Sequence, residues 1–168
     1  IPVQIAVLTV SDTRRPKDDR SGDVLEESIK AAGHSMAARD IVRDDVMEIT
    51  TKLKSWIAEP EIDVVITTGG TGVTGRDVTP EALSSVWEKE IPGFGELFRW
   101  ISYQKIKTST VQSRACAGVA NGTYIFSLPG SPGACKDGWD EILHDQLDIR
   151  HKPCNFVELM PRLNEHLK

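Results

Sequence analysis

The residues best suited to bind a ligand form one glycine- and threonine-rich run, Thr67-Thr68-Gly69-Gly70-Thr71-Gly72-Val73-Thr74-Gly75. Four glycines within 69–75 allow backbone conformations with positive φ and a close approach to a ligand, with amide N–H groups free to donate. The threonine hydroxyls add further donors. A flexible turn is the alternative interpretation. This density of Gly and Thr directly after an apolar strand favours the binding of an anion or a cofactor.

Aspartates lie close to this run. Asp77 follows it directly, and the pair Asp44-Asp45 follows another expected strand. Each aspartate could instead cap the helix that comes after it. Carboxylates beside bound phosphates usually act through Mg²⁺, which takes oxygen ligands and cancels the repulsion. Arg76 could hold the same phosphates with its forked guanidinium group, although a solvated surface arginine is the simpler alternative.

Two further loops carry small polar residues at strand ends. Ser11-Asp12-Thr13 follows the first apolar run, and Pro129-Gly130-Ser131-Pro132 follows the last one. Ligands of open parallel α/β sheets bind at the carboxyl ends of the strands, near the topological switch point. We therefore expect Ser11, Gly130 and Ser131 to lie at the same edge of the sheet as the glycine run.

The segment 70–75 also matches the dinucleotide-binding pattern G-x-G-x-x-G. That fingerprint normally follows the first strand, and its last glycine lies inside the next helix. Here Thr79-Pro80 marks the next helix start, as N-cap and first helical residue, four residues beyond Gly75. No Gly-Lys-Ser/Thr follows to make a P-loop. A dinucleotide-dependent oxidoreductase is therefore the less favoured alternative.

Short apolar runs alternate with amphipathic stretches along the chain. Strands are expected at 3–10, 35–42, 62–68 and 123–128. Helices are expected from about residue 20 to Gly33, after the capping-box pair Asp45 and Glu48, from Thr79 to about Lys89, around 94–101 and around 135–147. This order predicts a parallel sheet covered by helices on both faces. It also predicts one domain, 1–168, in which 150–168 form an extended tail with a short helical end.

Composition excludes several classes of protein. The net charge of −5 argues against a nucleic-acid surface, and no apolar run approaches the length of a membrane helix. Three cysteines without a C-x-x-C pair indicate reduced thiols in a cytoplasmic protein, and neither a disulfide framework nor a zinc site. The four histidines have no metal-ligand spacing.

Several of these motifs together resemble the MoaB/Mog family of molybdopterin-binding proteins. The joined segments TGGTG (68–72) and RDVTPEA (76–82) carry the resemblance at a specific spacing. It continues through 91–96 and 128–131 and covers most of the chain. The stretch 108–114 and the tail 150–156 resemble the B branch of the family.

This resemblance implies a three-layer α/β/α sandwich with a mostly parallel central sheet, assembled as a trimer or hexamer. It implies ATP- and Mg²⁺-dependent adenylylation of molybdopterin before molybdate insertion, in contact with other proteins of molybdenum cofactor biosynthesis. Asp44 and Asp77 would be the catalytic and metal-binding carboxylates. With the strand-end argument, the expected binding residues are Ser11, Thr68, Gly69, Gly70, Thr71, Gly72, Gly130 and Ser131.

Some alternatives stay open at this point. A non-catalytic carrier of molybdopterin is one, because some B-branch members lack the acidic pair, although this sequence keeps both carboxylates. The sequence does not distinguish ATP from GTP, molybdenum from tungsten, or a trimer from a hexamer. Phe94, Phe98 and Trp100 are candidates for an exposed oligomer surface, and core packing of the same rings is an equally good account.

Overall fold

Six strands form one sheet in the computed structural model, which describes residues 1–168. Their order across the sheet is β2-β1-β3-β6-β5-β4. The strands are β1 (Gln4–Val10), β2 (Ser35–Val42), β3 (Val64–Thr68), β4 (Lys89–Glu90), β5 (Cys116–Ala120) and β6 (Thr123–Leu128). Strands β2, β1, β3 and β6 are parallel, and β5 is antiparallel to both of its neighbours. The sheet is therefore mostly parallel, as predicted.

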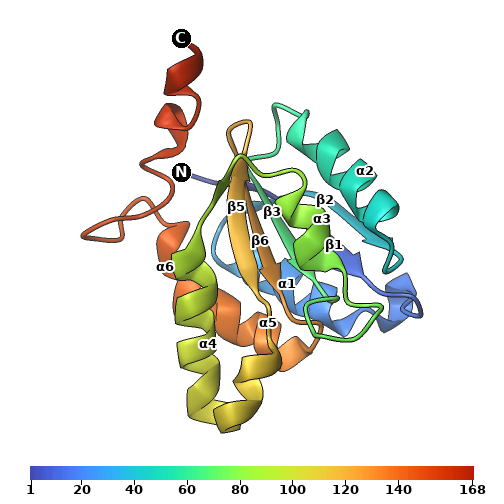
Figure 1. The fold of residues 1–168 in the computed structure, drawn as a ribbon. Coiled ribbons are helices and arrows are strands. Elements are labelled where there is room, and N and C mark those ends of the chain that lie inside the picture. Colours follow the sequence, from blue (N-terminus) through green and yellow to red (C-terminus); the bar gives the residue numbers. More distant parts are fainter.

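Helices cover both faces of this sheet and make three layers (Figure 1). The helices are α1 (Arg20–Ala31), α2 (Val46–Ile57), α3 (Thr79–Ser84), α4 (Pro92–Ile106), α5 (Pro132–Gly138) and α6 (His144–Gln146), with a π-helical turn (Trp139–Leu143) between the last two. One buried cluster joins the sheet to α1, α4 and α5, and a second joins its other face to α2 and α3. The predicted α/β/α sandwich is confirmed.

The sheet reverses its winding direction at β1. The chain leaves β1 toward β2 on one side and returns past it to β3 on the other. A reversal of this kind opens a crevice at the carboxyl ends of the two central strands, where loops diverge above and below the sheet. In this molecule those ends are Val10 and Thr68, so the serine-containing loop and the glycine run leave the sheet side by side.

Three expectations about elements need correction. The helix expected from Thr79 to Lys89 ends at Ser84, and Lys89–Glu90 pair with β5 as a short strand. Thr79 is the first helical residue, not the N-cap, which is Val78. Strand β5 was not expected, because Cys-Ala-Gly-Val-Ala offers few of the large β-branched or aromatic residues that indicate a strand.

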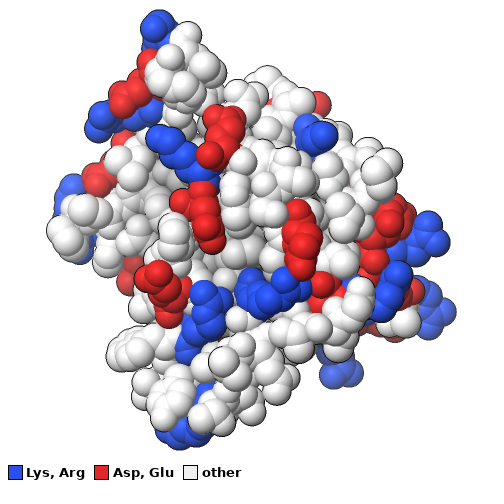
Figure 2. Space-filling model, viewed as in Figure 1, with Lys and Arg blue, Asp and Glu red and all other residues white.

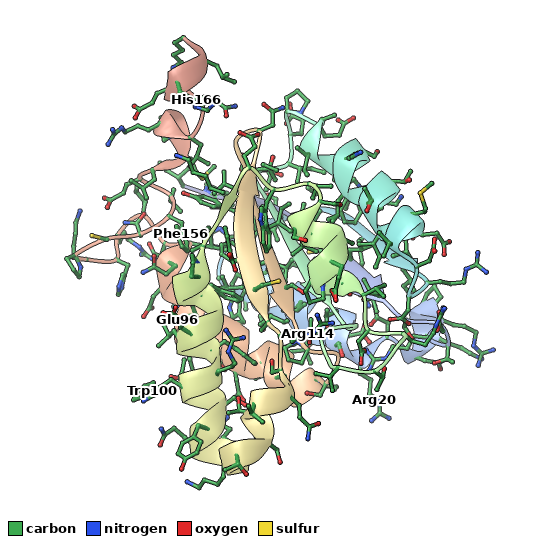
Figure 3. All side chains as sticks on the ribbon, in the orientation of Figure 1. Arg20, Glu96, Trp100, Arg114, Phe156 and His166 are labelled. Atoms are coloured by element: carbon green, nitrogen blue, oxygen red, sulfur yellow. The ribbon has the colours of Figure 1, made fainter.

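The aromatic residues of α4 divide between core and surface. Phe94 and Phe98 are buried in the cluster with α1 and α5, which corrects their candidacy for an exposed surface. Trp100 is 64% exposed and points away from the sheet (Figure 3). The tail packs Phe156 against Tyr124 and Phe126, and then extends from the body through two 3₁₀ turns (Figure 1). None of the helices has both the length and the apolar character that crossing a membrane demands.

Candidate functional site

The glycine run turns sharply where β3 ends. Gly69 and Gly70 have φ values of 106° and 70°, a region that side chains disfavour. A Cβ atom on Gly69 would lie 2.2 Å from the carbonyl oxygen of Val10, and one on Gly130 would lie 3.3 Å from Cα of Gly69. The run therefore passes between the end of β1 and the Pro129–Ser131 loop, and only glycine fits there. The three strand-end loops lie together, as predicted.

Several hydrogen bonds fix the start of this run. The Gly69 N–H donates to the carbonyl of Leu128 over 3.0 Å, and the Thr79 hydroxyl donates to the carbonyl of Gly69 over 2.8 Å. Thr68 is fully buried, and its hydroxyl donates to the carbonyl of Pro129 over 2.9 Å. Thr68 thus joins two loops to each other, whereas sequence reasoning took its hydroxyl for a ligand donor.

Beyond Gly69 the run has unused backbone donors. The N–H groups of Gly70, Thr71, Gly72 and Val73 donate no hydrogen bond within the chain, and neither do those of Gly130 and Ser131. Successive free amides in a glycine-rich turn form a concave site of positive potential that suits an anion. Gly70 and Gly72 are half-buried and Val73 is exposed, whereas Thr71 is buried, so part of this run is open to solvent.

Asp77 folds back over the run. Its Oδ2 accepts hydrogen bonds from the Thr74 N–H (3.0 Å) and the Thr74 hydroxyl (2.7 Å). A Cβ atom on Gly72 would lie 2.6 Å from that Oδ2. The carboxylate consequently lies directly against the glycine run, and Oδ1 makes no hydrogen bond within the chain.

Asp44 approaches the same run from the end of β2. A Cβ atom on Gly70 would lie 3.2 Å from Asp44 Oδ1. Partial burial raises the pKa of Asp44, and repulsion from the carboxylates of Asp12 and Asp77 raises it further. The neighbouring Asp45 caps α2 by accepting from the Glu48 N–H over 3.0 Å, as its capping-box spacing predicted. Asp44 is the aspartate of this pair that faces the glycine run.

Two arginines next to the run bond partners that are far away in the sequence. Arg76 donates to both carboxylate oxygens of Asp12, from Nε over 3.0 Å and from a terminal nitrogen over 2.9 Å. Arg114 donates to the carbonyls of Gly72 (2.7 Å) and Asp77 (2.8 Å) and pairs with Glu81. Figure 3 shows Arg114 between β5 and the loop before α3. Sequence reasoning assigned a role to neither Arg114 nor Asp12, because no local pattern indicates these partners.

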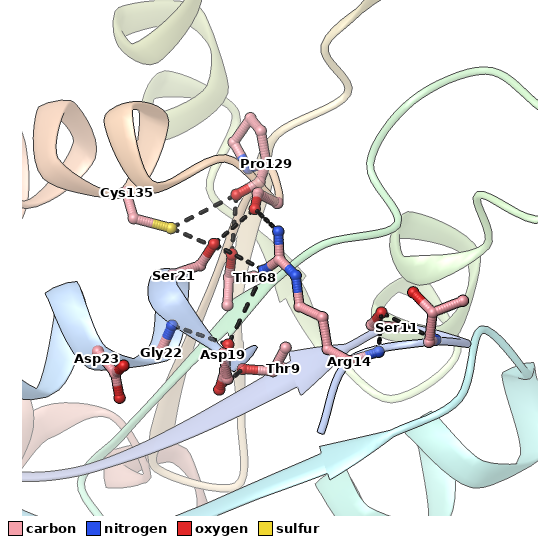
Figure 4. A network of polar contacts seen from close by, with 12 residues as sticks. Thr9, Ser11, Arg14, Asp19, Ser21, Gly22, Asp23, Thr68, Pro129 and Cys135 are labelled. Carbon is pink, nitrogen blue, oxygen red and sulfur yellow. Dashed lines mark hydrogen bonds and ion pairs between the residues drawn. The ribbon is translucent and has the colours of Figure 1, made fainter. Parts of the chain in front are cut away.

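The loop after β1 is joined to the Pro129–Ser131 loop by a polar network (Figure 4). Arg14 and Ser21 both donate to the carbonyl of Gly130, over 2.7 Å and 2.5 Å. The carboxylate of Asp19 is completely buried and accepts from Thr9, the Gly22 N–H and Arg39. This network fixes one wall of the site and was not anticipated from the sequence.

The two serines expected at the site both accept hydrogen bonds from backbone N–H groups of their own loops. Ser11 is half-buried, and its hydroxyl accepts from the N–H groups of Thr13 and Arg14. Ser131 is exposed, and its hydroxyl accepts from the Ala134 N–H at the start of α5. Both stand at the expected edge of the sheet, and both shape their own turns.

Two cavities open near the glycine run, although no residue of the run lines either of them. A cavity of about 590 Å³ opens at the ends of β1 and β2, lined among others by Ser11, Asp12, Arg15 and Arg43. A second, of about 570 Å³, opens beside β5, lined among others by Glu81, Trp87, Ser113 and Arg114. A third, of about 400 Å³, lies at the opposite end of the sheet beside His34 and Asp148. On the face drawn in Figure 2, acidic and basic side chains alternate and form no continuous basic surface.

The acidic residues suit a metal ion that arrives with its ligand. No group of three or more His, Cys, Asp or Glu side chains is arranged to hold an ion by itself. Mg²⁺ often binds through one or two carboxylates and completes its shell with phosphate oxygens and water. Burial raises the pKa of Asp44, and the neighbouring carboxylates of Asp12 and Asp77 raise it further by a repulsion that a cation between them would relieve. Asp44 and Asp77 fit this kind of site.

Comparison with known proteins identifies the family of this chain. A family model described as a probable molybdopterin binding domain matches residues 6–149. The molybdenum cofactor biosynthesis protein B of Escherichia coli K12 is 49% identical over 156 residues, which cover 93% of this chain and 92% of that protein. The protein of the same name from Staphylococcus carnosus is 45% identical and covers 87% of each chain.

Solved structures extend the likeness to the whole fold. A crystal structure of a molybdenum cofactor biosynthesis protein B superposes with a TM-score of 0.88 at 38% identity, covering 98% of both chains. The tungsten cofactor synthesizing protein MoaB of Pyrococcus furiosus superposes with a TM-score of 0.77 at 38% identity, covering 86% of this chain and 92% of that one. The chain therefore belongs to the MoaB/Mog family of molybdopterin-binding domains that serve molybdenum cofactor biosynthesis.

Proposed function

We propose that this protein binds molybdopterin and transfers an adenylyl group to it from ATP, ahead of metal insertion. The observation that supports this most directly is the position of two carboxylates on separate loops, Asp44 and Asp77, which both lie against one glycine run. That run offers free amide donors for a phosphate group. Cavities lined by Asp12 and by Arg114 offer room for substrates near it.

The chemistry asked of the protein is mainly positioning. A phosphate oxygen of molybdopterin would attack the α-phosphorus of ATP, the bond from that phosphorus to the bridging oxygen would break, and pyrophosphate would leave. The amides of Gly70 to Gly72 would hold the attacking phosphate in line, since such fixed donors need no reorganisation during the reaction. Asp44 and Asp77 would hold Mg²⁺, which would offset the negative charge of the phosphates. We further propose that the protein works in the cytoplasm, where its three free thiols stay reduced.

The deciding experiment is an assay of pyrophosphate release. The purified chain is mixed with molybdopterin, ATP and Mg²⁺, and pyrophosphate and adenylylated pterin are measured together. We expect both to form in equal amounts and to need Mg²⁺. GTP in place of ATP tests the choice of nucleotide. Binding of molybdopterin with no pyrophosphate release would contradict catalysis and support the alternative function, a carrier that hands molybdopterin to a partner.

A further inference from the structure

The carboxylate of Asp12 lies between the two loops that bring Asp44 and Asp77 to the glycine run. Its Oδ1 accepts the backbone N–H of Asp44 over 3.0 Å and a terminal N–H of Arg76 over 2.9 Å. Its Oδ2 accepts the Nε–H of Arg76 over 3.0 Å. Asp12 therefore contacts the backbone of Asp44 directly. It is linked to Asp77 through Arg76, the residue that precedes Asp77.

No other polar contact spans these two loops. The hydrogen bonds and ion pairs of the chain include none that joins segment 43–45 directly to segment 70–78. The carboxylate of Asp44 lies beside Gly70, where an added Cβ atom would come within 3.2 Å of its Oδ1, and it makes no hydrogen bond to the run. The polar link between the two loops across the glycine run thus comes from a residue of a third loop, the one that follows β1.

The contact with Arg76 has a geometry that fixes direction as well as distance. Two parallel N–H···O bonds from a planar guanidinium to a carboxylate permit little rotation of either group. Because the two side chains are 68% and 35% exposed, the pair contributes little to the stability of the fold. The expected consequence of losing Asp12 is a folded protein whose two acidic loops are less well placed.

We propose that Asp12 is a positioning residue, which sets the separation of the Asp44 and Asp77 loops across the glycine run. It acts through the Asp44 backbone and Arg76 and needs no contact with either substrate. This inference rests on the proposed adenylyl transfer for its kinetic consequence, but its structural consequence is independent of any substrate.

The test compares Asp12→Ala and Asp12→Asn with a matched control, Asp18→Asn. Asp18 belongs to the same loop and also pairs with an arginine, Arg15, but that pair stays within the loop. Amide hydrogen exchange by NMR reports the Asp44 N–H directly. We expect exchange at Asp44 to accelerate about tenfold in Asp12→Ala, because that amide loses its acceptor. Asp12→Asn keeps an acceptor oxygen and should accelerate it less, and Asp18→Asn not at all.

The kinetic arm separates positioning from general destabilisation. In Asp12→Ala we expect kcat of pyrophosphate release to fall about 100-fold, since small displacements of reacting groups have effects of this size. KM for molybdopterin should hardly change, and Asp12→Asn should recover part of kcat. Combining Asp12→Ala with Arg76→Ala should lower kcat less than the product of the single effects, because both variants break one link.

Each outcome bears on one claim. Wild-type kcat in Asp12→Ala, with fast exchange at Asp44, would overturn the positioning role and leave adenylyl transfer intact. Unchanged exchange at Asp44 would show that the hydrogen bond to Asp12 is not made in solution, and the inference would fail on its structural basis. No pyrophosphate release by the wild-type protein would refute the proposed function, while the exchange measurement would still decide whether Asp12 holds the Asp44 loop.

Discussion

The hydroxyl of Thr79 donates a hydrogen bond to the carbonyl oxygen of Gly69, 2.8 Å away, so the first residue of α3 holds the first glycine of the run. The Thr79 N–H also donates to the carbonyl of Gly70 over 3.1 Å. Thr79 is completely buried. Thr79 was expected to cap its own helix. Its hydroxyl instead donates to Gly69, ten residues earlier in the chain, in the turn that shapes the site.

Replacing Thr79 with valine tests this link. The variant keeps the shape of the side chain and leaves the buried carbonyl of Gly69 without that donor. We expect a loss of about 1–3 kcal/mol in the free energy of unfolding, measured by urea denaturation. Ser84→Ala removes an exposed hydroxyl bond within α3 and should change stability by less than about 0.5 kcal/mol. Equal stabilities for the two variants would contradict the structural role of Thr79.

The glycines of the run should differ sharply in their tolerance of alanine. Gly69→Ala introduces a Cβ atom 2.2 Å from a backbone oxygen at φ 106°, and Gly70→Ala one 2.3 Å from the Thr79 hydroxyl oxygen at φ 70°. Strain of this kind costs about 1–3 kcal/mol per residue before any steric overlap. Gly75 has open space at the same position and serves as the control. Thermal unfolding should rank Gly75→Ala near wild type and both others well below it.

Asp77 has two roles that separate substitutions can distinguish. Asp77→Asn keeps the size of the side chain and one acceptor for Thr74 but removes the charge, so pyrophosphate release should slow about 10²- to 10³-fold with little change in stability. Thr74→Val removes the hydroxyl that orients the carboxylate over 2.7 Å and leaves the charge, so its effect should be below about tenfold. If Thr74→Val were the slower enzyme, the charge of Asp77 would not be what matters.

His34 makes the fold sensitive to acid. Its Nδ1 accepts the Val3 N–H over 3.0 Å, which requires the unprotonated atom, and burial lowers its pKa below the ordinary 6.5, with the charge of Asp148 opposing this. The folded state then binds the proton less readily than the unfolded state. The stabilising contribution of unprotonated His34 is therefore complete above pH 6.5 and is lost as pH falls through the lower folded-state pKa.

The matched variant for this prediction is His34→Asn, whose side-chain oxygen can accept from the same N–H without titrating. Urea denaturation at a series of pH values from 7.5 to about 5 should show wild type losing more stability than the variant. Parallel curves for the two proteins over this range would assign the acid sensitivity to another group.

Local pattern was sufficient for the parallel strands and for the glycine run. Strands such as β1 and β3 are buried on both faces, so nearly every residue is apolar and the signal is continuous. Strand β5 lies toward the edge of the sheet, and Gly118 there leaves room for the ring of Trp87. A glycine that is needed because a distant ring packs against it adds nothing to the alternating apolar pattern of a strand. The sequence therefore could not indicate β5.

The site divides in the same way. Gly69 and Gly70 were predictable because their conformation is a local property of the chain. The partners of Asp12 and Arg114 lie 64 and 42 positions away, and such pairing depends on the tertiary fold. Thr68 shows the opposite error, since a hydroxyl next to a binding loop was taken for a ligand donor and is used within the protein. Residue type indicates which bonds are possible, and the fold decides which are made.

The outward face of α4 gives the last prediction. This face carries four large hydrophobic residues spaced three apart, Leu97, Trp100, Tyr103 and Ile106, which are 42%, 64%, 46% and 51% exposed. Large hydrophobic side chains exposed together on the outward half of a surface helix are typical of a contact with another protein chain. We therefore propose that this face joins copies of the chain into the trimer or hexamer that the family resemblance implied.

Trp100→Glu should lower the mass measured by sedimentation equilibrium to that of a smaller species, because it places a charge in an apolar contact. Met47→Glu is the control, since Met47 is 74% exposed on α2, on the other side of the sheet. The proposal would be contradicted if the wild-type protein sedimented as a monomer, or if the Trp100→Glu variant stayed assembled. This face of α4 would then contact another partner or none.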